Sequence, residues 1–583
     1  MATKISEKKS LIFAGVGFVF LAVLHFPDAI FPHVFDKNAP AQFLTLTLLA
    51  AVFALVIFLK PHRFRFPKLV TYGALALVSA QLTSLALSGN LVGSLFGDAG
   101  RFVGSASVFA LLAVSIFHSQ FNFDAFLNLL KFYIGAIEIV VAIGIAQHFS
   151  LLDLPGDHGV TSTLGNTDFF AAFVGTSLPL LLLLGLESGR KLRVALALAA
   201  IVNIYALRLA GPLQGYLDIA FTVLGASFLL IRKYIPRRDL SLNVRTFLGT
   251  FAIIIWAEFI FMMPFLGHFI PVLGNDVQVK IRSNFWLAGM RQFFSHPLIG
   301  VGPDQYGNYY EHYRTLEDVQ KFPNILSNDA HSASVQTLAT LGIFGTLAFI
   351  FLLALVIRSL LILWDANKIS RRALFAIGLY IFVYLTNSFV SPFTLTHKYL
   401  FWALCGFLIG QVYRQPSWKS LSLASIRYSA LSAFAIFALM ASVFAQAQWN
   451  YMTTVEAYAQ KKDTKLEFTK TSVLPCFMYF DAKLIVQRSV SAESALQLAL
   501  DEIDAHPRCV AAQIEITKTV VNSGDMTNLG QLVYRLYELA PARSETLSYG
   551  MFYANRAGDL QFKATLEKAL KTLGLVYIPG KLG

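Results

Sequence analysis

The chain has 583 residues, of which 56% are hydrophobic and only 14% are charged, and its mean hydropathy is +0.59. Soluble domains carry roughly 25% charged residues, so this composition excludes an ordinary soluble protein. The net charge of +13 does not indicate a nucleic-acid partner, because residues 1–446 carry 32 basic and 20 acidic side chains, with the excess in short loops between apolar segments.

Apolar windows follow one another through residues 1–446, and each is long enough to cross a bilayer, which takes about 20 residues. We therefore predict an all-α fold, a polytopic integral membrane domain of about 13 transmembrane helices. The predicted spans centre on residues 11–26, 42–59, 69–87, 102–117, 129–147, 169–186, 192–207, 213–231, 247–265, 335–363, 374–389, 399–413 and 428–445.

The basic residues in the loops predict the orientation. With the N-terminus in the cytoplasm, the cytoplasmic segments contain 23 Lys and Arg, whereas the short outside loops contain only Lys37, Arg101, Arg208 and Lys398. Such a bias follows the positive-inside rule. We therefore predict a cytoplasmic N-terminus, retained as a signal anchor, a large extracytoplasmic loop at residues 266–333 and an extracytoplasmic C-terminus.

Residues 447–583 have a different character, with 15 basic and 14 acidic side chains and no apolar window long enough to span a membrane. Pro507 recurs as Pro541, and Gly524 recurs as Gly558, in both cases 34 residues later. This spacing resembles that of tetratricopeptide repeats. We predict a soluble, extracytoplasmic helical repeat domain that presents a concave surface to a protein partner. An irregular helical bundle without a partner is the alternative.

Arginines on the predicted outer side need a reason, because they oppose the charge bias. Arg101 follows a glycine, Arg208 ends a predicted span, and Arg282 lies on an amphipathic segment of the large loop. A guanidinium group binds phosphate oxygens through two parallel hydrogen bonds and keeps its charge at all relevant pH values. The alternative is an interfacial anchor that reaches the lipid headgroups. We expect the other basic residues of the loop to be solvated, namely Arg291, Arg314 and Lys321.

His331 stands at the outer boundary of the tenth predicted span, among small residues that leave room for a substrate. A neutral imidazole there could accept the proton of a hydroxyl group. The alternative is an interfacial histidine without a role. Asp304 and Asp329 are candidates for orienting His331 or holding an ion, but no metal-binding motif occurs, so no metal site is predicted. Cys476 and Cys509 could pair in an oxidising compartment.

Several short motifs occur in a fixed order around the large loop. They are Arg282-x-x-x-Trp286, Pro297-Leu298-x-Gly300-x-Gly302-x-x-x-Tyr306, Ala330-His331-Ser332-x-x-x-Gln336 and Gly342-Ile343-x-Gly345, preceded by Gly100-Arg101-x-x-Gly104 and Gly165-Asn166-Thr167-Asp168-Phe169. Together they resemble the O-antigen ligase and O-antigen polymerase family over roughly residues 69–413. The sequence departs from the family pattern at Ser332, at Thr340 and around Arg208.

The resemblance implies a glycosyltransferase-C-like membrane fold in the bacterial cytoplasmic (inner) membrane. It implies transfer of a polyprenyl-diphosphate-linked glycan to an acceptor hydroxyl of a lipid, glycan or protein, by an inverting, metal-independent reaction without a cofactor. Arg282 would contact the diphosphate, His331 would take the hydroxyl proton, and Arg101 or Arg208 would make a secondary phosphate contact. The remaining expected substrate contacts are Tyr306, Gly300 and Gly302.

Three activities within this family stay open: a ligase, a surface-polysaccharide polymerase and a protein O-oligosaccharyltransferase. Two other classes are a transporter of a lipid-linked anion and a non-catalytic membrane scaffold. A transporter would need charged residues at mid-span, whereas here they gather at the outer boundary. Turnover of a lipid-linked glycan would separate an enzyme from both of these classes.

Overall fold

A computed structural model gives the fold, and the regular secondary structure of the described residues consists of helices. The structure describes residues 2–24, 39–64, 67–97, 101–152, 154, 159–231, 241–266, 277–322, 325, 327–413, 421–459 and 508–577. No β-strand occurs in these ranges. The all-α prediction is therefore confirmed for the described part of the chain.

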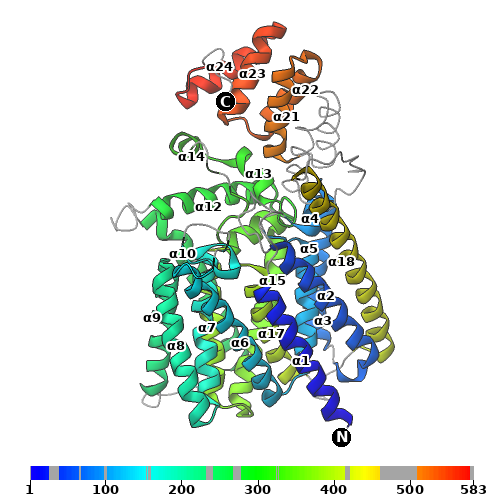
Figure 1. The fold of residues 1–583 in the computed structure, drawn as a ribbon, viewed down its shortest axis with the longest axis vertical. Helices are drawn as coiled ribbons and strands as arrows, with labels where there is room; N and C mark the ends of the chain where they lie inside the picture. Colours follow the sequence, from blue (N-terminus) through cyan, green and yellow to red (C-terminus); the bar gives the residue numbers. More distant parts are fainter. Residues whose placement is uncertain are drawn as a thin grey trace.

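The predicted membrane part forms a bundle of helices that run mostly along the long axis of the molecule (Figure 1). An unbroken helix satisfies its own backbone hydrogen bonds, which the hydrocarbon core of a bilayer requires. The helices of this part are α1 (Ala2–Val23), α2 (Ala39–Leu59), α3 (Lys68–Leu87), α4 (Leu91–Phe96), α5 (Ser105–His118), α6 (Phe123–His148), α7 (Thr167–Leu186), α8 (Arg190–Ala210), α9 (Leu213–Ile231), α10 (Leu242–Leu266), α15 (Ala333–Ala366), α16 (Arg371–Ser388), α17 (Leu395–Tyr413) and α18 (Leu423–Ala459).

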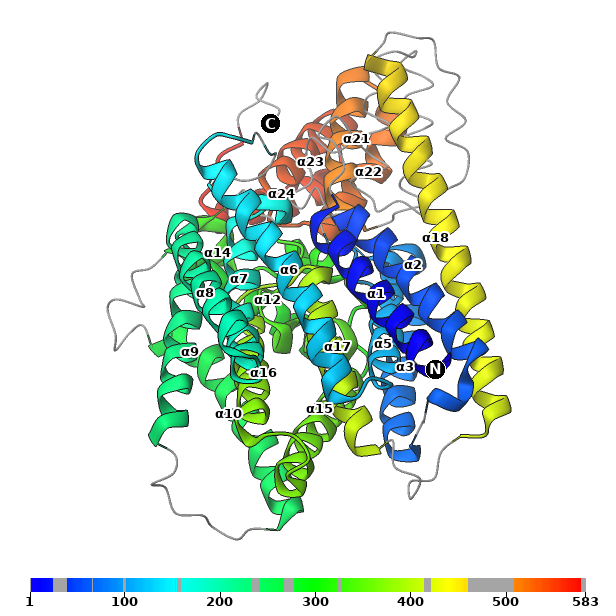
Figure 2. The ribbon, with the colours of Figure 1, turned by 60° about the horizontal axis from the view of Figure 1, so that its bottom comes forward.

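Eight helices of the described chain are long and apolar enough to cross a membrane, namely α2, α3, α6, α7, α8, α10, α15 and α18. A multi-pass membrane protein is therefore supported. The other five predicted spans also overlap helices, which are α1, α5, α9, α16 and α17. The total of thirteen spans stays a prediction. Far-separated segments lie side by side in the bundle, as α18 does with α2 (Figure 2).

The large loop forms its own short helices at one end of the bundle. They are α12 (Val277–Ser295), α13 (Tyr306–Tyr313) and α14 (Leu316–Lys321). α12 lies across this end, and α13 and α14 lie between it and the C-terminal helices (Figure 1). The start of α1 lies at the opposite end of the molecule.

Two glycine motifs of the loop and of α15 meet backbone to backbone. Gly342 breaks the helical dihedral angles of α15, with φ 62° and ψ −162°. A Cβ atom on Gly300 would lie 2.2 Å from the carbonyl carbon of Thr340, so only glycine fits there. Four backbone hydrogen bonds join the segments, from Ile343 to Pro297 (2.9 Å), from Phe344 to Leu298 (3.3 Å), from Val301 to Ala339 (2.9 Å) and from Gly302 to Thr340 (3.1 Å). The loop is thereby fixed to α15, the helix that follows His331.

The C-terminal helices occur in two pairs: α21 (Val510–Ser523) with α22 (Met526–Leu539), and α23 (Ser544–Ala557) with α24 (Leu560–Leu573). The second pair repeats the first pair 34 residues later along the chain. Gly524 and Gly558 end the first helix of each pair with φ near 70°, where glycine is favoured.

The aspartates after these glycines, Asp525 and Asp559, accept backbone N–H bonds that cap the next helix. The Gly-Asp dipeptide therefore recurs because it ends one helix and begins another. The predicted helical pair around residues 491–505 and the predicted pairing of Cys476 lie outside the described residues. An independently soluble repeat domain stays a prediction.

Candidate functional site

His331 lies just before α15 in a conformation that non-glycine residues seldom adopt, with φ 53°. Asp329 holds it there. Oδ1 of Asp329 accepts a hydrogen bond from the backbone N–H of His331 (2.6 Å), and the Asp329 carbonyl oxygen lies 3.0 Å from Nδ1 of the imidazole. Because a carbonyl can only accept, Nδ1 must carry the proton, which leaves the lone pair on Nε2. The strained backbone and fixed tautomer are typical of a functional residue.

Arg101 is bound to the same aspartate. Its Nη1 lies 2.9 Å from Oδ2 of Asp329, and both side chains are buried. The guanidinium group also lies over the ring of Phe169, 5.9 Å from its centroid. Arg101 therefore neutralises Asp329 and holds it in place, so it affects the site through Asp329 and through its positive charge near His331.

Arg282 lies on α12 and is held more loosely. Its Nη2 lies 3.4 Å from Oδ2 of Asp168, and both side chains are partly exposed. Asp168 stands in the first turn of α7, where Asn166 caps the helix. One turn after Arg282, the ring of Phe285 lies 5.0 Å from the imidazole of His331. α12 thus brings Arg282 to the neighbourhood of His331, with its guanidinium free to exchange a long ion pair for a ligand.

The surroundings keep the imidazole neutral. Burial lowers the pKa of His331 from 6.5 to about 4, and the positive charge of Arg101 lowers it further. Asp329 opposes this shift, and Arg282 adds a smaller lowering effect. His331 is therefore uncharged at neutral pH, as a proton acceptor must be.

Tyr306, Gly300 and Gly302 hold the elements that carry the site, because they contact α12 and α15. The buried hydroxyl of Tyr306 donates to the carbonyl oxygen of Phe285 on α12 (2.8 Å), and Gln292 of α12 donates to the Tyr306 carbonyl (3.1 Å). The two glycines anchor the loop to α15 as described above. Their contacts give these three residues a structural role, and direct contact with a substrate stays a prediction for them.

Arg208 is not part of this cluster. It is exposed in the last turn of α8 and forms no ion pair or hydrogen bond with any described residue. The next helix connects this region to the site, because the Gln214 side chain donates to the backbone carbonyl of Asp168. Arg208 therefore lies near the start of α7 without touching the residues around His331.

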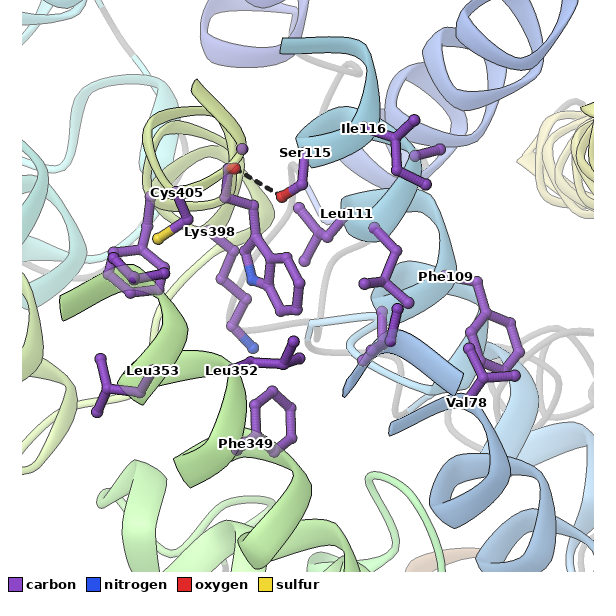
Figure 3. A pocket seen from close by; sticks show the side chains of 18 of the residues that line it. Val78, Phe109, Leu111, Ser115, Ile116, Phe349, Leu352, Leu353, Lys398 and Cys405 are labelled. Atoms are coloured by element: carbon purple, nitrogen blue, oxygen red, sulfur yellow. Dashed lines mark hydrogen bonds between the residues drawn. The ribbon is translucent and has the colours of Figure 1, made fainter. Parts of the chain in front are cut away.

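A large apolar cavity of about 1130 Å³ opens between α3, α5, α15, α17 and α18. Figure 3 shows part of its wall, with Leu352 and Phe349 near Lys398, and with Phe109 and Val78 farther away. The polar lining residues include Asp329, Ser334, Gln336 and Lys398. Asp329 therefore borders the cavity and also holds His331.

Lys398 is a residue that the sequence-based prediction missed. It lies in the first turn of α17, and its electrostatic neighbours are Asp329, Asp304 and Arg101. A signal was present, because Lys398 is one of the four basic residues that oppose the charge bias of the short loops. Asp168 stands in the Gly165–Phe169 motif, but its contact with Arg282 was not predicted, since an acidic residue in the first turn is common at any helix N-terminus.

One expectation about the loop is wrong. Arg314 was expected to be solvated, yet its side chain is only 1% exposed and lies between Glu311 and Asp318. The two carboxylate partners lie three residues before and four residues after Arg314, so the loop itself supplies them. Lys321 is exposed as expected, and Arg291 is exposed with one bond to the Arg314 carbonyl (3.2 Å).

No three His, Cys, Asp or Glu side chains come together as metal ligands within the described ranges. Metal independence stays a prediction. Neither a scan against protein-family models nor a search of curated proteins finds a match to this chain.

Proposed function

We propose that this protein transfers a polyprenyl-diphosphate-linked glycan to an acceptor hydroxyl at the outer face of the cytoplasmic membrane. One observation carries the proposal. A histidine with a free Nε2 lone pair stands beside Arg101 and Arg282, and the aspartate that holds it borders a large apolar cavity. This arrangement combines a base, cationic groups for a leaving phosphate and space for a lipid.

The cavity suits the lipid part of the donor. Ligand cavities for small molecules usually enclose roughly 300–1,000 Å³, and this cavity of about 1130 Å³ is larger and mainly apolar. With a polyprenyl chain among α3, α5 and α15, the diphosphate would lie at the polar end, near Lys398. Arg282 would leave its long contact with Asp168 and bind the phosphate oxygens.

The proton and the leaving group define the mechanism. The acceptor oxygen attacks the anomeric carbon from the face opposite the diphosphate, which inverts the configuration. Nε2 of His331 takes the proton of that hydroxyl as the new bond forms. The bond from the anomeric carbon to the phosphate oxygen breaks, and positive groups stabilise the negative charge that develops on the diphosphate.

The low pKa of His331 has a place in this mechanism. A base with a pKa of about 4 is a weak proton acceptor at neutral pH. The bound diphosphate brings negative charge beside the imidazole and neutralises part of the field of Arg101 and Arg282, so it raises the pKa. His331 would therefore become an effective base only when the donor is bound. Without the donor, its imidazole would stay neutral and ready to accept a proton.

The proposed membrane arrangement has thirteen spans, a cytoplasmic N-terminus and an outer, soluble C-terminal repeat domain. The start of α1 and the helices α21–α24 lie at opposite ends of the molecule, as an odd number of spans requires (Figure 1). Cys509 is disulfide-bonded, which is typical of an oxidising compartment.

The test uses the purified protein in lipid nanodiscs with a lipid-linked glycan and a hydroxyl-bearing acceptor. We expect glycan on the acceptor and an equal amount of released polyprenyl diphosphate. A protein that binds the donor but never releases polyprenyl diphosphate with any glycan or acceptor would contradict the proposal. Surface glycans of a deletion strain then separate the family activities, because loss of chain length indicates a polymerase and loss of attachment indicates a ligase.

A further inference from the structure

The C-terminal helices pack directly on the loop that carries the candidate site. Val319 of α14 belongs to the same hydrophobic cluster as the cores of α21–α24. Nδ1 of His312 donates to the carbonyl oxygen of Glu538 on α22 (2.9 Å), and the Gln320 side chain donates to the carbonyl of Thr572 on α24 (3.3 Å). Both helix pairs therefore contact the loop.

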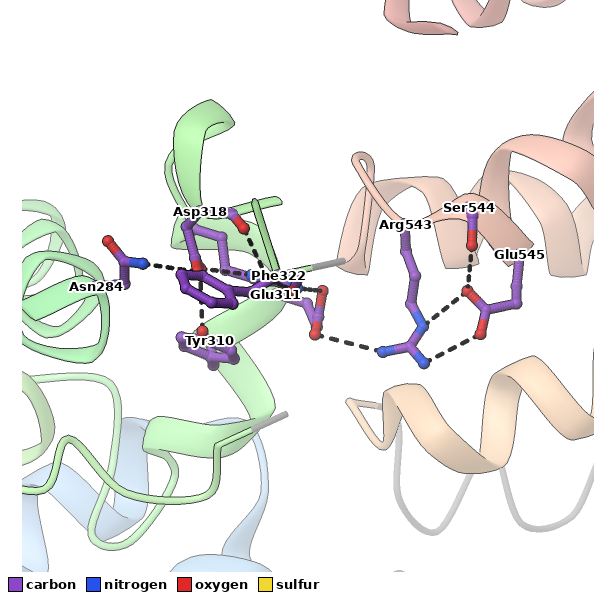
Figure 4. A network of polar contacts seen from close by, with 9 residues as sticks. Asn284, Tyr310, Glu311, Asp318, Phe322, Arg543, Ser544 and Glu545 are labelled. Atoms are coloured by element: carbon purple, nitrogen blue, oxygen red, sulfur yellow. Dashed lines mark hydrogen bonds and ion pairs between the residues drawn. The ribbon is translucent and has the colours of Figure 1, made fainter. Parts of the chain in front are cut away.

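A buried network of charges lies at the centre of this contact (Figure 4). Arg543, at the start of α23, places Nη1 3.4 Å from Oε1 of Glu311 and Nη2 3.1 Å from Oε1 of Glu545. The other oxygen of Glu311, Oε2, lies 3.5 Å from Nη1 of Arg314. Glu311 is thus shared between an arginine of the loop and an arginine 232 residues further along the chain.

The network continues to the helix that carries Arg282. Nε of Arg314 donates to Oδ2 of Asp318 (2.7 Å), and Oδ1 of Asp318 accepts from the side chain of Asn284 (3.0 Å). Asn284 lies on α12, two residues after Arg282. An unbroken series of polar contacts therefore joins α23 to the middle of α12.

The chemistry of Glu311 indicates that this network sets geometry more than it stabilises the fold. Burial raises the pKa of Glu311 above its usual value, although Arg314 and Arg543 both act to lower it. Asp318 adds to the rise, so burial and this neighbouring carboxylate together disfavour the charged form of Glu311. Buried ion pairs of this kind add little stability, yet breaking one is costly, because it leaves a charge without a partner.

We propose that Arg543 is a positioning residue for donor binding: through Glu311, Arg314 and Asp318, the C-terminal helices hold α12 where Arg282 meets the donor diphosphate. The inference rests on the proposed role of Arg282. The C-terminal helices would then help to form the donor-binding site, and a displacement of these helices would change the affinity for the lipid-linked donor.

The test compares Arg543→Ala with Arg556→Ala in the full-length protein. Arg556 lies at the other end of α23, over the ring of Phe552, and forms no ion pair or hydrogen bond with the described part of the loop, so it is the matched control for a lost charge. Coupling between sites usually changes affinity by 5- to 150-fold, so we expect Arg543→Ala to weaken donor binding roughly 5- to 50-fold. The control should bind as the wild type does, and Arg543→Lys, which keeps the charge without the fork, should lie between.

The decisive arm repeats Arg543→Ala in an Arg282→Ala background. If Arg543 acts through Arg282, its loss should then change donor affinity by less than about twofold, because contributions through a shared partner are not additive. An undiminished effect in that background would overturn the inference and assign Arg543 a general structural role.

Hydrogen exchange provides a readout that does not depend on transfer activity. Arg543→Ala should increase exchange of the backbone amides in α12, and Arg556→Ala should not. Unchanged exchange in α12 would overturn the inference even if transfer occurs. Absence of transfer by the wild-type protein, with exchange changed as expected, would instead contradict the proposed function and leave the link between α23 and α12 in place.

Discussion

The low pKa of His331 predicts how transfer depends on pH. Under the proposed mechanism, the imidazole of the donor-free protein is neutral above about pH 4, so kcat/KM should stay constant through neutral pH and fall only as pH drops toward that value. In the donor complex the diphosphate raises the pKa, so the fall in kcat should begin at a higher pH. The perturbation that tests the cause is Arg101→Gln, which removes a cation beside the imidazole.

The size of the expected change in the pH profile follows from the lowered pKa of His331. Lowering the pKa from 6.5 to about 4 corresponds to a cost of about 3 kcal/mol for charging the imidazole. Burial accounts for the largest part and Arg101 for the next. Without Arg101, the carboxylate of Asp329 would face His331 unopposed. Nearby charges commonly shift a pKa by one to three units, so the acid limb of kcat/KM should rise by roughly one pH unit or more.

The assay measures initial transfer rates between pH 3.5 and 8 in nanodiscs, with the thermal transition of each sample recorded at each pH. Arg101→Lys is the matched control, because it keeps the positive charge, and its limb should stay near that of the wild type. A wild-type limb in kcat/KM near pH 6.5 would refute the burial argument. If kcat/KM falls at the same pH in Arg101→Gln and in the wild type, the argument that the charge of Arg101 lowers the pKa of His331 is refuted.

Three other substitutions have distinct expected results. Arg282→Ala should weaken donor binding in a direct binding assay and slow transfer. Arg282→Lys should restore only part of both, because an ammonium group lacks the bidentate fork. Lys280→Ala, which removes an exposed cation from the same helix, should leave donor binding and transfer unchanged. Lys398→Gln should reduce affinity for a polyprenyl diphosphate that carries no sugar. Unchanged affinity would show that the donor diphosphate does not bind beside Lys398. Gly300→Ala should lower the free energy of unfolding by roughly 1–3 kcal/mol or more, because its Cβ would meet the backbone of α15; Gly135→Ala, with open space around it, should not destabilise the protein in thermal unfolding.

The elements that local sequence specifies were predictable. Apolar runs gave the helices of the bundle, and each predicted span overlaps one helix. The 34-residue recurrence of Gly524 and Asp525 marked helix ends correctly, because capping depends on neighbouring residues alone. The structure places Arg282 close enough to His331 to influence its charge, while a shared role of the two residues in transfer stays a prediction.

The partners of charged residues were not predictable from local sequence. Glu311 meets Arg543 across 232 residues of chain, although its other partner, Arg314, lies only three residues away. Asp168 meets Arg282 across 114 residues of chain. Such pairings arise from packing between distant segments, which neither periodicity nor composition records.

The packing of Gly300 against α15 was also not predictable from local sequence. The family resemblance implied a substrate contact for Gly300, whereas the structure shows its backbone packed against the backbone of α15 beside the break at Gly342. Glycine is required in both cases, since both need close backbone approach. The sequence alone cannot tell which neighbour approaches.

The most direct test of the central claim measures transfer and donor binding together in His331→Ala. We expect donor affinity close to that of the wild type, because the charge of Arg282 remains, and turnover lowered by roughly 10²–10⁴-fold, the usual effect of a lost general base. Turnover near the wild-type rate in His331→Ala would contradict the account.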